Sequence, residues 1–194
     1  MLSFFFVPLC FQNFITMSAI QIKDLTFVPY INETDLLQAV DEVAQKINTD
    51  YKGKEILFVG VLNGVFMFAS DLLKRIDLEC QISFVKLSSY DGTQSTEVVK
   101  QLFGLTESVE DKHVILLEDI VDTGLTIDGI YNDLLKQNPA SLEVCTLLYK
   151  PEKYTKGVPI KYIAKSIPNG FVVGYGLDYD GYGRNISSIY QLKP

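Results

Sequence analysis

Two adjacent carboxylates end an apolar run and are followed by a turn of Thr and Gly. The run is residues 114–117, the carboxylates are Glu118 and Asp119, and the turn covers residues 122–126, Asp-Thr-Gly-Leu-Thr. Carboxylates held at a strand end can accept hydrogen bonds from vicinal hydroxyls or approach a hydrated cation. Consecutive backbone N–H groups and two hydroxyls at a helix N-terminus bind an anion without a lysine. The segment predicts a site for a hydroxylated, anionic ligand.

Each of these features has a plain structural explanation when it is taken alone. Glu118 and Asp119 could be solvated charges at a strand end, and Asp122 could merely cap a helix. The combination within residues 114–126 favours the site over those separate explanations.

The elements that must hold this segment alternate along the chain. Residues after Asn32 or Thr34, residues after Gly64 and residues 127–135 have apolar side chains at helical spacing. Apolar runs of strand length cover residues 56–62, 81–87, 114–117, 142–149 and 171–173. Such alternation predicts a mostly parallel sheet with helices on both faces. Ligands of such folds bind at the carboxyl ends of the strands, where the acidic pair stands.

Residues 88–96, SSYDGTQST, interrupt this regular pattern with small and polar side chains. The composition is typical of a mobile loop. An ordinary surface hairpin is the alternative, and the sequence alone does not choose between the two.

Composition fits one globular domain of 194 residues, because 47% are hydrophobic and 21% charged. The net charge of -7 and the pI near 4.7 argue against a nucleic-acid binder with a basic face. Cys10, Cys80 and Cys145 show no CxxC spacing, so neither a zinc site nor a disulfide framework is predicted. A reducing cytoplasm is the simplest compartment.

The N-terminal residues 1–16 are apolar and contain no Lys or Arg, which a secretory signal carries before its hydrophobic stretch. They are too short to span a bilayer as a helix. Because Met17 opens a more conventional start, we interpret residues 1–16 as a non-native or disordered extension and residues 17–194 as the domain. A weak signal peptide or a membrane-surface segment is the alternative, and no membrane partner is expected.

The acidic pair and the D-T-G-x-T turn resemble the PRPP-binding signature of type I phosphoribosyltransferases. The resemblance covers residues 20–192 and is closest to the hypoxanthine-guanine phosphoribosyltransferases. It implies an α/β fold with a mostly parallel central sheet flanked by helices, a small hood and a mobile catalytic loop. It also implies transfer of a phosphoribosyl group from PRPP to a 6-oxopurine, Mg²⁺ as cofactor, and a homodimer or homotetramer.

The resemblance implies roles for individual residues, with Asp122 as the catalytic base. The residues that match the PRPP site are Glu118, Asp119, Asp122, Thr123, Gly124, Leu125 and Thr126. Pyrophosphate contacts match Asn63, Gly64 and Arg184, and the catalytic loop matches Ser89 and Tyr90. Purine contacts match Lys150, Phe171, Val172 and Asp178, and metal contacts match Glu118, Asp119 and Asp178.

Two positions depart from the family pattern. Many relatives carry Lys where this chain has Asn63, and some carry Lys where it has Leu125, so backbone amides must replace two cations. Phe171 could instead be a core residue and Arg184 a surface ion pair. His113, the only histidine, has no evident nucleophile partner and is expected at the surface.

Two other functions are compatible with the same residues. One is a xanthine-preferring phosphoribosyltransferase, and the other is a non-catalytic regulator that senses PRPP or nucleotide. The presence of Asp122, Lys150 and the Ser89-Tyr90 pair favours catalysis.

Overall fold

The computed structural model describes residues 17–90, 99–105 and 107–194. The expected N-terminal extension, residues 1–16, lies outside the described residues, as does the part of the expected catalytic loop in residues 91–96. Both therefore stay predictions.

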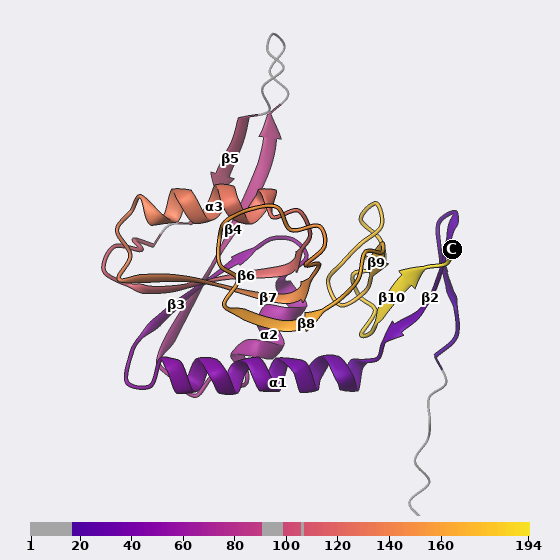
Figure 1. Ribbon diagram of the computed structural model, residues 1–194, viewed down its shortest axis with the longest axis horizontal. Coiled ribbons are helices and arrows are strands. Elements are labelled where there is room, and N and C mark those ends of the chain that lie inside the picture. The colour runs from indigo at the N-terminus through magenta and orange to yellow at the C-terminus, as the bar shows by residue number, and fades with distance from the viewer. Residues whose placement is uncertain (1–16, 91–98, 106) are drawn as a thin grey trace, which may run out of the picture.

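The main sheet has six strands in the order β5-β4-β3-β6-β7-β8 (Figure 1). Its strands are β3 (Ile56–Val61), β4 (Cys80–Tyr90), β5 (Val99–Phe103), β6 (His113–Val121), β7 (Ser141–Tyr149) and β8 (Tyr162–Ser166). All pairs are parallel except β4 with β5. The prediction of a mostly parallel sheet is confirmed.

Helices cover both faces of this sheet, as predicted. The helices α1 (Glu33–Asp50) and α2 (Phe66–Leu73) contact each other on one face, and α3 (Leu125–Leu135) contacts β6 and β7 on the other (Figure 1). Neighbouring residues of β3 point to opposite faces, so Phe58 joins the core under α1 and Val59 the core under α3. Burial on both faces explains the continuous apolar runs.

Helix α1 shows how the sequence sets a boundary. The side chain of Asn32 accepts a hydrogen bond from the backbone N–H of Asp35 at 2.8 Å, so Asn32 is the N-cap.

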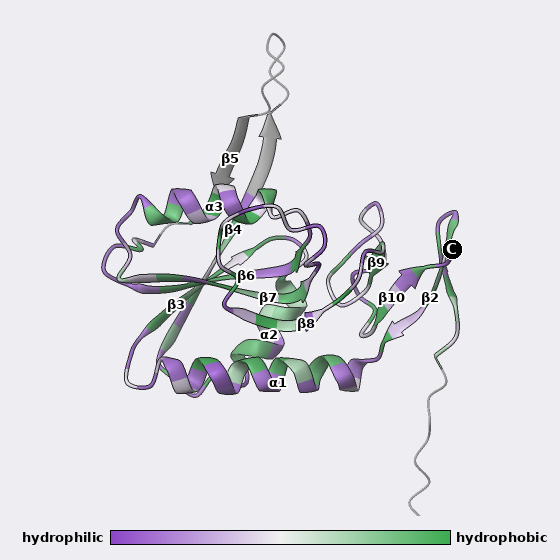
Figure 2. Ribbon diagram, in the orientation of Figure 1, coloured by the Kyte–Doolittle hydropathy of each residue, from purple (hydrophilic) through white to green (hydrophobic). Residues whose placement is uncertain are grey.

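Hydrophilic and hydrophobic residues alternate in patches along α1 and α3, as expected of helices with one covered side (Figure 2). No helix described within residues 17–194 combines the length and apolar character needed to cross a membrane.

A second, four-stranded antiparallel sheet has the order β1-β2-β10-β9 and forms the expected small hood. Its strands are β1 (Ile20–Ile22), β2 (Leu25–Ile31), β9 (Val172–Val173) and β10 (Ile189–Leu192). They enclose a separate small core that includes Phe27 and Val173. The hood lies beside the main sheet and contains both the first and the last strands of the chain (Figure 1).

Three predicted boundaries need correction. Ser89 and Tyr90 lie in β4, paired with Lys100 and Val99 of β5, and not in a loop. The strand β6 continues past residue 117 to Val121 and so contains the acidic pair itself. The strand expected at residues 171–173 is reduced to β9.

Candidate functional site

The acidic pair lies in the last part of β6, where a strand backbone fixes both carboxylates. Glu118 is only 8% exposed, and its Oε2 atom is buried without a hydrogen-bond partner. Burial, with the charge of Asp119 as a smaller cause, raises the pKa of Glu118 well above its ordinary value. Burial likewise raises the pKa of Asp119 to about 6, although Asp119 accepts a hydrogen bond from the N–H of Ile120 at 2.8 Å. An acidic pair in which Glu118 is buried and Asp119 is half-buried favours a cation or hydroxyl donors beside it.

This burial predicts a pH-dependent stability of the ligand-free protein. The pKa of Asp119 in the folded chain lies above 3.8, so its contribution to stability is full below that pH and is lost as the pH rises through about 6. We expect the free energy of unfolding of Asp119→Asn, relative to wild type, to increase from pH 4 to pH 7 in urea titrations. A difference that stays constant over this range would contradict the assignment.

The phosphate-type turn stands between β6 and α3. Gly124 has φ 84° and is the N-cap of α3, a left-handed conformation that favours glycine. A Cβ atom there would lie 2.4 Å from Cε2 of Tyr154, so the turn also needs a residue without a side chain. A small hollow is lined by Glu118 and residues 120–127. Glu118 and the turn therefore border one space at a helix N-terminus.

Asp122 is held by two lysines from the segment after β7. Lys150 is 5% exposed and donates from Nζ to Oδ2 of Asp122 at 2.9 Å, and Nζ of Lys153 lies 3.3 Å from the same oxygen. Burial alone would raise the pKa of Asp122, but the hydrogen bonds and charges of Lys150 and Lys153 outweigh it and lower this pKa. The Oδ1 atom is buried without a partner. The site therefore holds an ionised carboxylate with one oxygen free to accept a proton or hydrogen bond.

Three elements meet at two glycines beside the acidic pair. A Cβ atom on Gly64, in the loop between β3 and α2, would lie 1.5 Å from Oδ2 of Asp119. A Cβ atom on Gly176, which follows β9 with φ +100°, would lie 2.0 Å from the carbonyl oxygen of Gly64. Asn63 is exposed next to this contact. The predicted pyrophosphate loop thus lies directly against β6 and the hood segment.

The hood side of the site carries Asp178 and Arg184 in contact with each other. The Nη2 atom of Arg184 lies 2.7 Å from Oδ1 of Asp178, and Nη1 donates to the carbonyl of Gly176 at 2.7 Å. The Oδ2 atom of Asp178 accepts from the N–H of Gly181 at 2.6 Å. Arg184 is therefore tied to the segment that contacts Gly64.

Phe171 is not a core residue, since 44% of it is exposed. Its ring centroid lies 6.0 Å from those of Phe27 and Tyr179, which support it from the hood. The neighbouring Val172 is buried in β9. An exposed ring with aromatic support can stack on a planar ligand.

The three predicted metal contacts do not form one cluster, and the predicted catalytic-loop pair lies at a strand end. Among the described side chains, no three His, Cys, Asp or Glu residues are close enough to form a metal site, so Asp178 does not complete a cluster with Glu118 and Asp119. Ser89 and Tyr90 belong to the end of β4, and their catalytic role stays a prediction.

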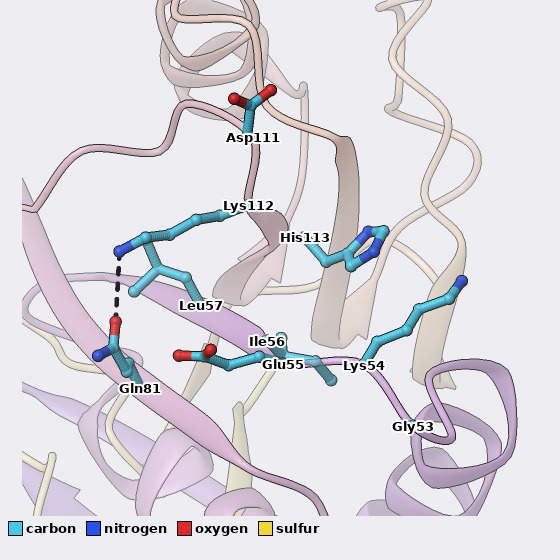
Figure 3. Close-up of a pocket in the computed structure, with 9 residues that line it drawn as sticks. All are labelled: Gly53, Lys54, Glu55, Ile56, Leu57, Gln81, Asp111, Lys112 and His113. Atoms are coloured by element: carbon cyan, nitrogen blue, oxygen red, sulfur yellow. Dashed lines mark hydrogen bonds between the residues drawn. The ribbon is translucent and has the colours of Figure 1, made fainter.

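His113 begins β6, at the opposite end from the acidic pair. It is half-buried, not fully at the surface, with Nδ1 2.8 Å from Oγ of Ser141. It lines a hollow with Lys54, Glu55 and Lys112 at the amino ends of the strands (Figure 3). This hollow lies away from the predicted ligand edge of the sheet.

Sequence reasoning missed Lys153 and Tyr154. The sequence places Lys153 three residues after Lys150, and a single turn brings two residues at this spacing to the same side of the chain. Tyr154 gave no signal, since its role depends on the close approach of Gly124.

A family model described as the phosphoribosyl transferase domain matches residues 31–180. The chain belongs to the phosphoribosyltransferase family. A hypoxanthine-guanine phosphoribosyltransferase of Staphylococcus aureus strain Mu50 is 43% identical over 165 residues, which are 84% of this chain and 92% of that protein. One from Staphylococcus epidermidis strain ATCC 12228 is also 43% identical, over 88% of this chain and 96% of its own length.

Solved structures extend this family relation to the fold. A hypoxanthine-guanine phosphoribosyltransferase from Bacillus anthracis superposes with a TM-score of 0.76 at 34% identity, covering 85% of this chain and 96% of that one. A mutant of the Trypanosoma cruzi hypoxanthine phosphoribosyltransferase, in a ternary substrates complex, gives 0.78 at 35% identity, covering 86% and 95%. The expected type I phosphoribosyltransferase fold is confirmed.

Proposed function

We propose that this phosphoribosyltransferase transfers the 5-phosphoribosyl group of PRPP to N9 of hypoxanthine, guanine or both, in purine salvage. The products are IMP or GMP and pyrophosphate. The observation that carries the proposal is the ionised Asp122, placed between a phosphate-type turn and the nearly buried Lys150. The names of the relatives support the choice of base.

The turn and the acidic pair fit the ribose 5-phosphate part of PRPP. Backbone N–H groups and hydroxyls of Thr123, Gly124, Leu125 and Thr126 would hold the 5-phosphate. Glu118 and Asp119 would accept hydrogen bonds from the ribose hydroxyls. Their charge would also favour the positive charge that develops on the sugar as pyrophosphate leaves.

The pyrophosphate and the base would occupy the hood side. The backbone of Asn63 and Gly64 and the guanidinium of Arg184 would contact the pyrophosphate. Phe171 would stack on the purine, the main chain of Val172 would read its edge, and Lys150 would donate to its 6-oxo group. Asp122 would take the proton from N7 as N9 attacks C1 of the ribose.

The acidic pair also fits Mg²⁺, which prefers oxygen ligands and takes few of them from protein. The partnerless Oε2 atom of Glu118, with Asp119 beside it, is a donor set of this kind. Bound there, the ion would neutralise charge on the pyrophosphate and orient it for departure. Asp178 is the proposed contact of a second ion, which would have to share this carboxylate with Arg184.

The test is a spectrophotometric assay with PRPP, Mg²⁺ and each purine in turn. We expect PRPP-dependent turnover of hypoxanthine, guanine or both, and none of adenine. A preference for xanthine would replace the proposal by the xanthine-preferring enzyme. PRPP binding without turnover of any purine would replace it by the sensing regulator.

Replacing Asp122 by Asn tests its role as the base. The amide keeps the shape and can accept one hydrogen bond, but it cannot take the proton from N7. We expect kcat to fall at least about tenfold, while the Kd of PRPP measured by calorimetry changes little. An equal loss in PRPP affinity would instead assign Asp122 to phosphate binding.

By the same family relation, we propose a cytoplasmic homodimer or homotetramer. Analytical ultracentrifugation of the purified protein at micromolar concentration tests the oligomeric state. A monomer at all concentrations would contradict it.

A further inference from the structure

Asp122 receives two ammonium groups on one carboxylate oxygen. The Nζ atoms of Lys150 and Lys153 lie 2.9 Å and 3.3 Å from Oδ2. The side chain of Lys150 is 6% exposed and that of Lys153 45% exposed. One cation is therefore fixed inside the site, and the other approaches from solvent.

The chain after β7 is shaped to present both lysines together. The N–H groups of Lys153 and Tyr154 donate to the carbonyl of Lys150 at 3.1 and 3.2 Å, which closes a single turn. The N–H of Lys150 donates to the carbonyl of Val121 at 3.0 Å, which fixes the start of that turn beside Asp122. Residues three apart in such a turn lie on one side.

Lys150 would have two acceptors, since an ammonium group carries three donor hydrogens, and movement toward the base would weaken its hydrogen bond to Asp122. The proposed function requires its ammonium to donate to the 6-oxo group of the base, yet in the ligand-free chain the same ammonium balances Asp122. If Lys150 turned away and no other cation were present, the carboxylate of Asp122, whose side chain is 33% exposed and whose Oδ1 atom is buried without a partner, would lose its compensation, which has a free-energy cost. A second cation on Asp122 removes this cost.

We propose that Lys153 is a positioning residue that holds Asp122 as a charged acceptor, so that Lys150 can turn its ammonium toward the 6-oxo group of the purine. This inference rests on the proposed function, because it takes the purine as the second partner of Lys150. Lys153 acts through Asp122 and need not touch the base.

The other charges around Asp122 do not replace Lys153. The charged groups on its own strand, on α3 and on the facing segment are Glu118, Asp119, Asp128, Asp133, Lys150, Glu152, Lys153 and Lys156. Glu118 and Asp119 would disfavour a negative charge on Asp122. Lys156 lies 3.8 Å from Asp128 on α3 and is paired there.

The test compares Lys153→Met, which keeps the aliphatic stem without the charge, with Lys153→Arg, which keeps the charge. For Lys153→Met we expect kcat/KM for hypoxanthine to fall about three- to tenfold at neutral pH. The acid limb of the pH profile should move up by roughly 0.2–0.7 pH unit, the range of a partly exposed ion pair. In Lys153→Arg, both kcat/KM for hypoxanthine and the acid limb of the pH profile should stay at their wild-type values. In both variants the Kd of PRPP should stay within about twofold of wild type.

Lys136→Met is the matched control, because Lys136 forms an exposed ion pair with Asp133 on the far part of α3. A pH profile of Lys153→Met that superimposes on those of wild type and Lys136→Met would overturn the proposal. An equal loss of kcat/KM for hypoxanthine in Lys153→Arg would also overturn the proposal.

A second measurement separates this inference from the proposed function. The carboxyl ¹³C signal of Asp122 in the ligand-free protein reports its titration without any substrate. We expect its pKa to rise in Lys153→Met and not in Lys136→Met; no rise would overturn the inference. If wild type turned over no 6-oxopurine, the proposed function would fail, whatever this signal showed.

Discussion

Gly64→Ala should reduce kcat/KM for PRPP by at least about a hundredfold, because displacement of reacting groups by about an ångström has effects of this size. The new Cβ atom would lie 1.5 Å from Oδ2 of Asp119, so the carboxylate or the loop must move. Asp119 is fixed through its Oδ1 atom to the N–H of Ile120. The carbonyl of Gly64 is itself in close contact with Gly176, which limits a shift of the loop. The substitution therefore separates the predicted pyrophosphate loop from the acidic pair.

Gly129→Ala is the matched control, since a Cβ atom there meets nothing within 4 Å. It lies inside α3, where replacing glycine by alanine should stabilise the helix by roughly 0.5–1 kcal/mol without affecting turnover. Steady-state kinetics and thermal unfolding of both variants make the comparison. A Gly64→Ala enzyme with full activity would show that Gly64 and Asp119 need not be in contact.

Much of the central sheet could be predicted, because its strands are covered on both faces and so appear as continuous apolar runs. Residues 56–62 and 142–149 predicted β3 and β7 to within one residue at each end. Of the hood strands, only β9 was indicated by a local pattern, the apolar run at residues 171–173. The hood strands β1 and β9 are three and two residues long, and β9 pairs with β10, which is separated from it by a long irregular segment.

The candidate site, like the fold, could be predicted only where its residues are neighbours in the sequence. Residues 118–126 are continuous, so their types alone indicated an acidic pair followed by an anion-binding turn. The contact of Gly64 with Asp119 depends on two strands lying side by side, and no local pattern reports it. The pairing of Asp178 with Arg184 was equally hidden, because it depends on the path of the hood segment.

Lys150→Gln should change the class of base that the enzyme accepts. An ammonium donates to a 6-oxo group and repels the donor hydrogens of a 6-amino group, whereas an amide can turn either its oxygen or its nitrogen toward the base. The nearly complete burial of Lys150 strengthens this discrimination, because little water screens the ammonium. Selectivity for hypoxanthine over adenine should therefore fall.

The loss of one charge-assisted hydrogen bond should lower kcat/KM for hypoxanthine by about ten- to a hundredfold. Because Lys150 also pairs with Asp122, part of this loss will come through the carboxylate, and that part should not alter the choice of base. The ratio of kcat/KM for hypoxanthine to that for adenine isolates the contribution of Lys150 to base recognition. In Lys153→Met this ratio should fall only modestly, since Lys150 remains but is held more strongly by Asp122, while in Lys150→Gln it should collapse. An unchanged ratio in Lys150→Gln would assign the lysine to holding Asp122 alone, and base selection would then have to come from the backbone at Val172.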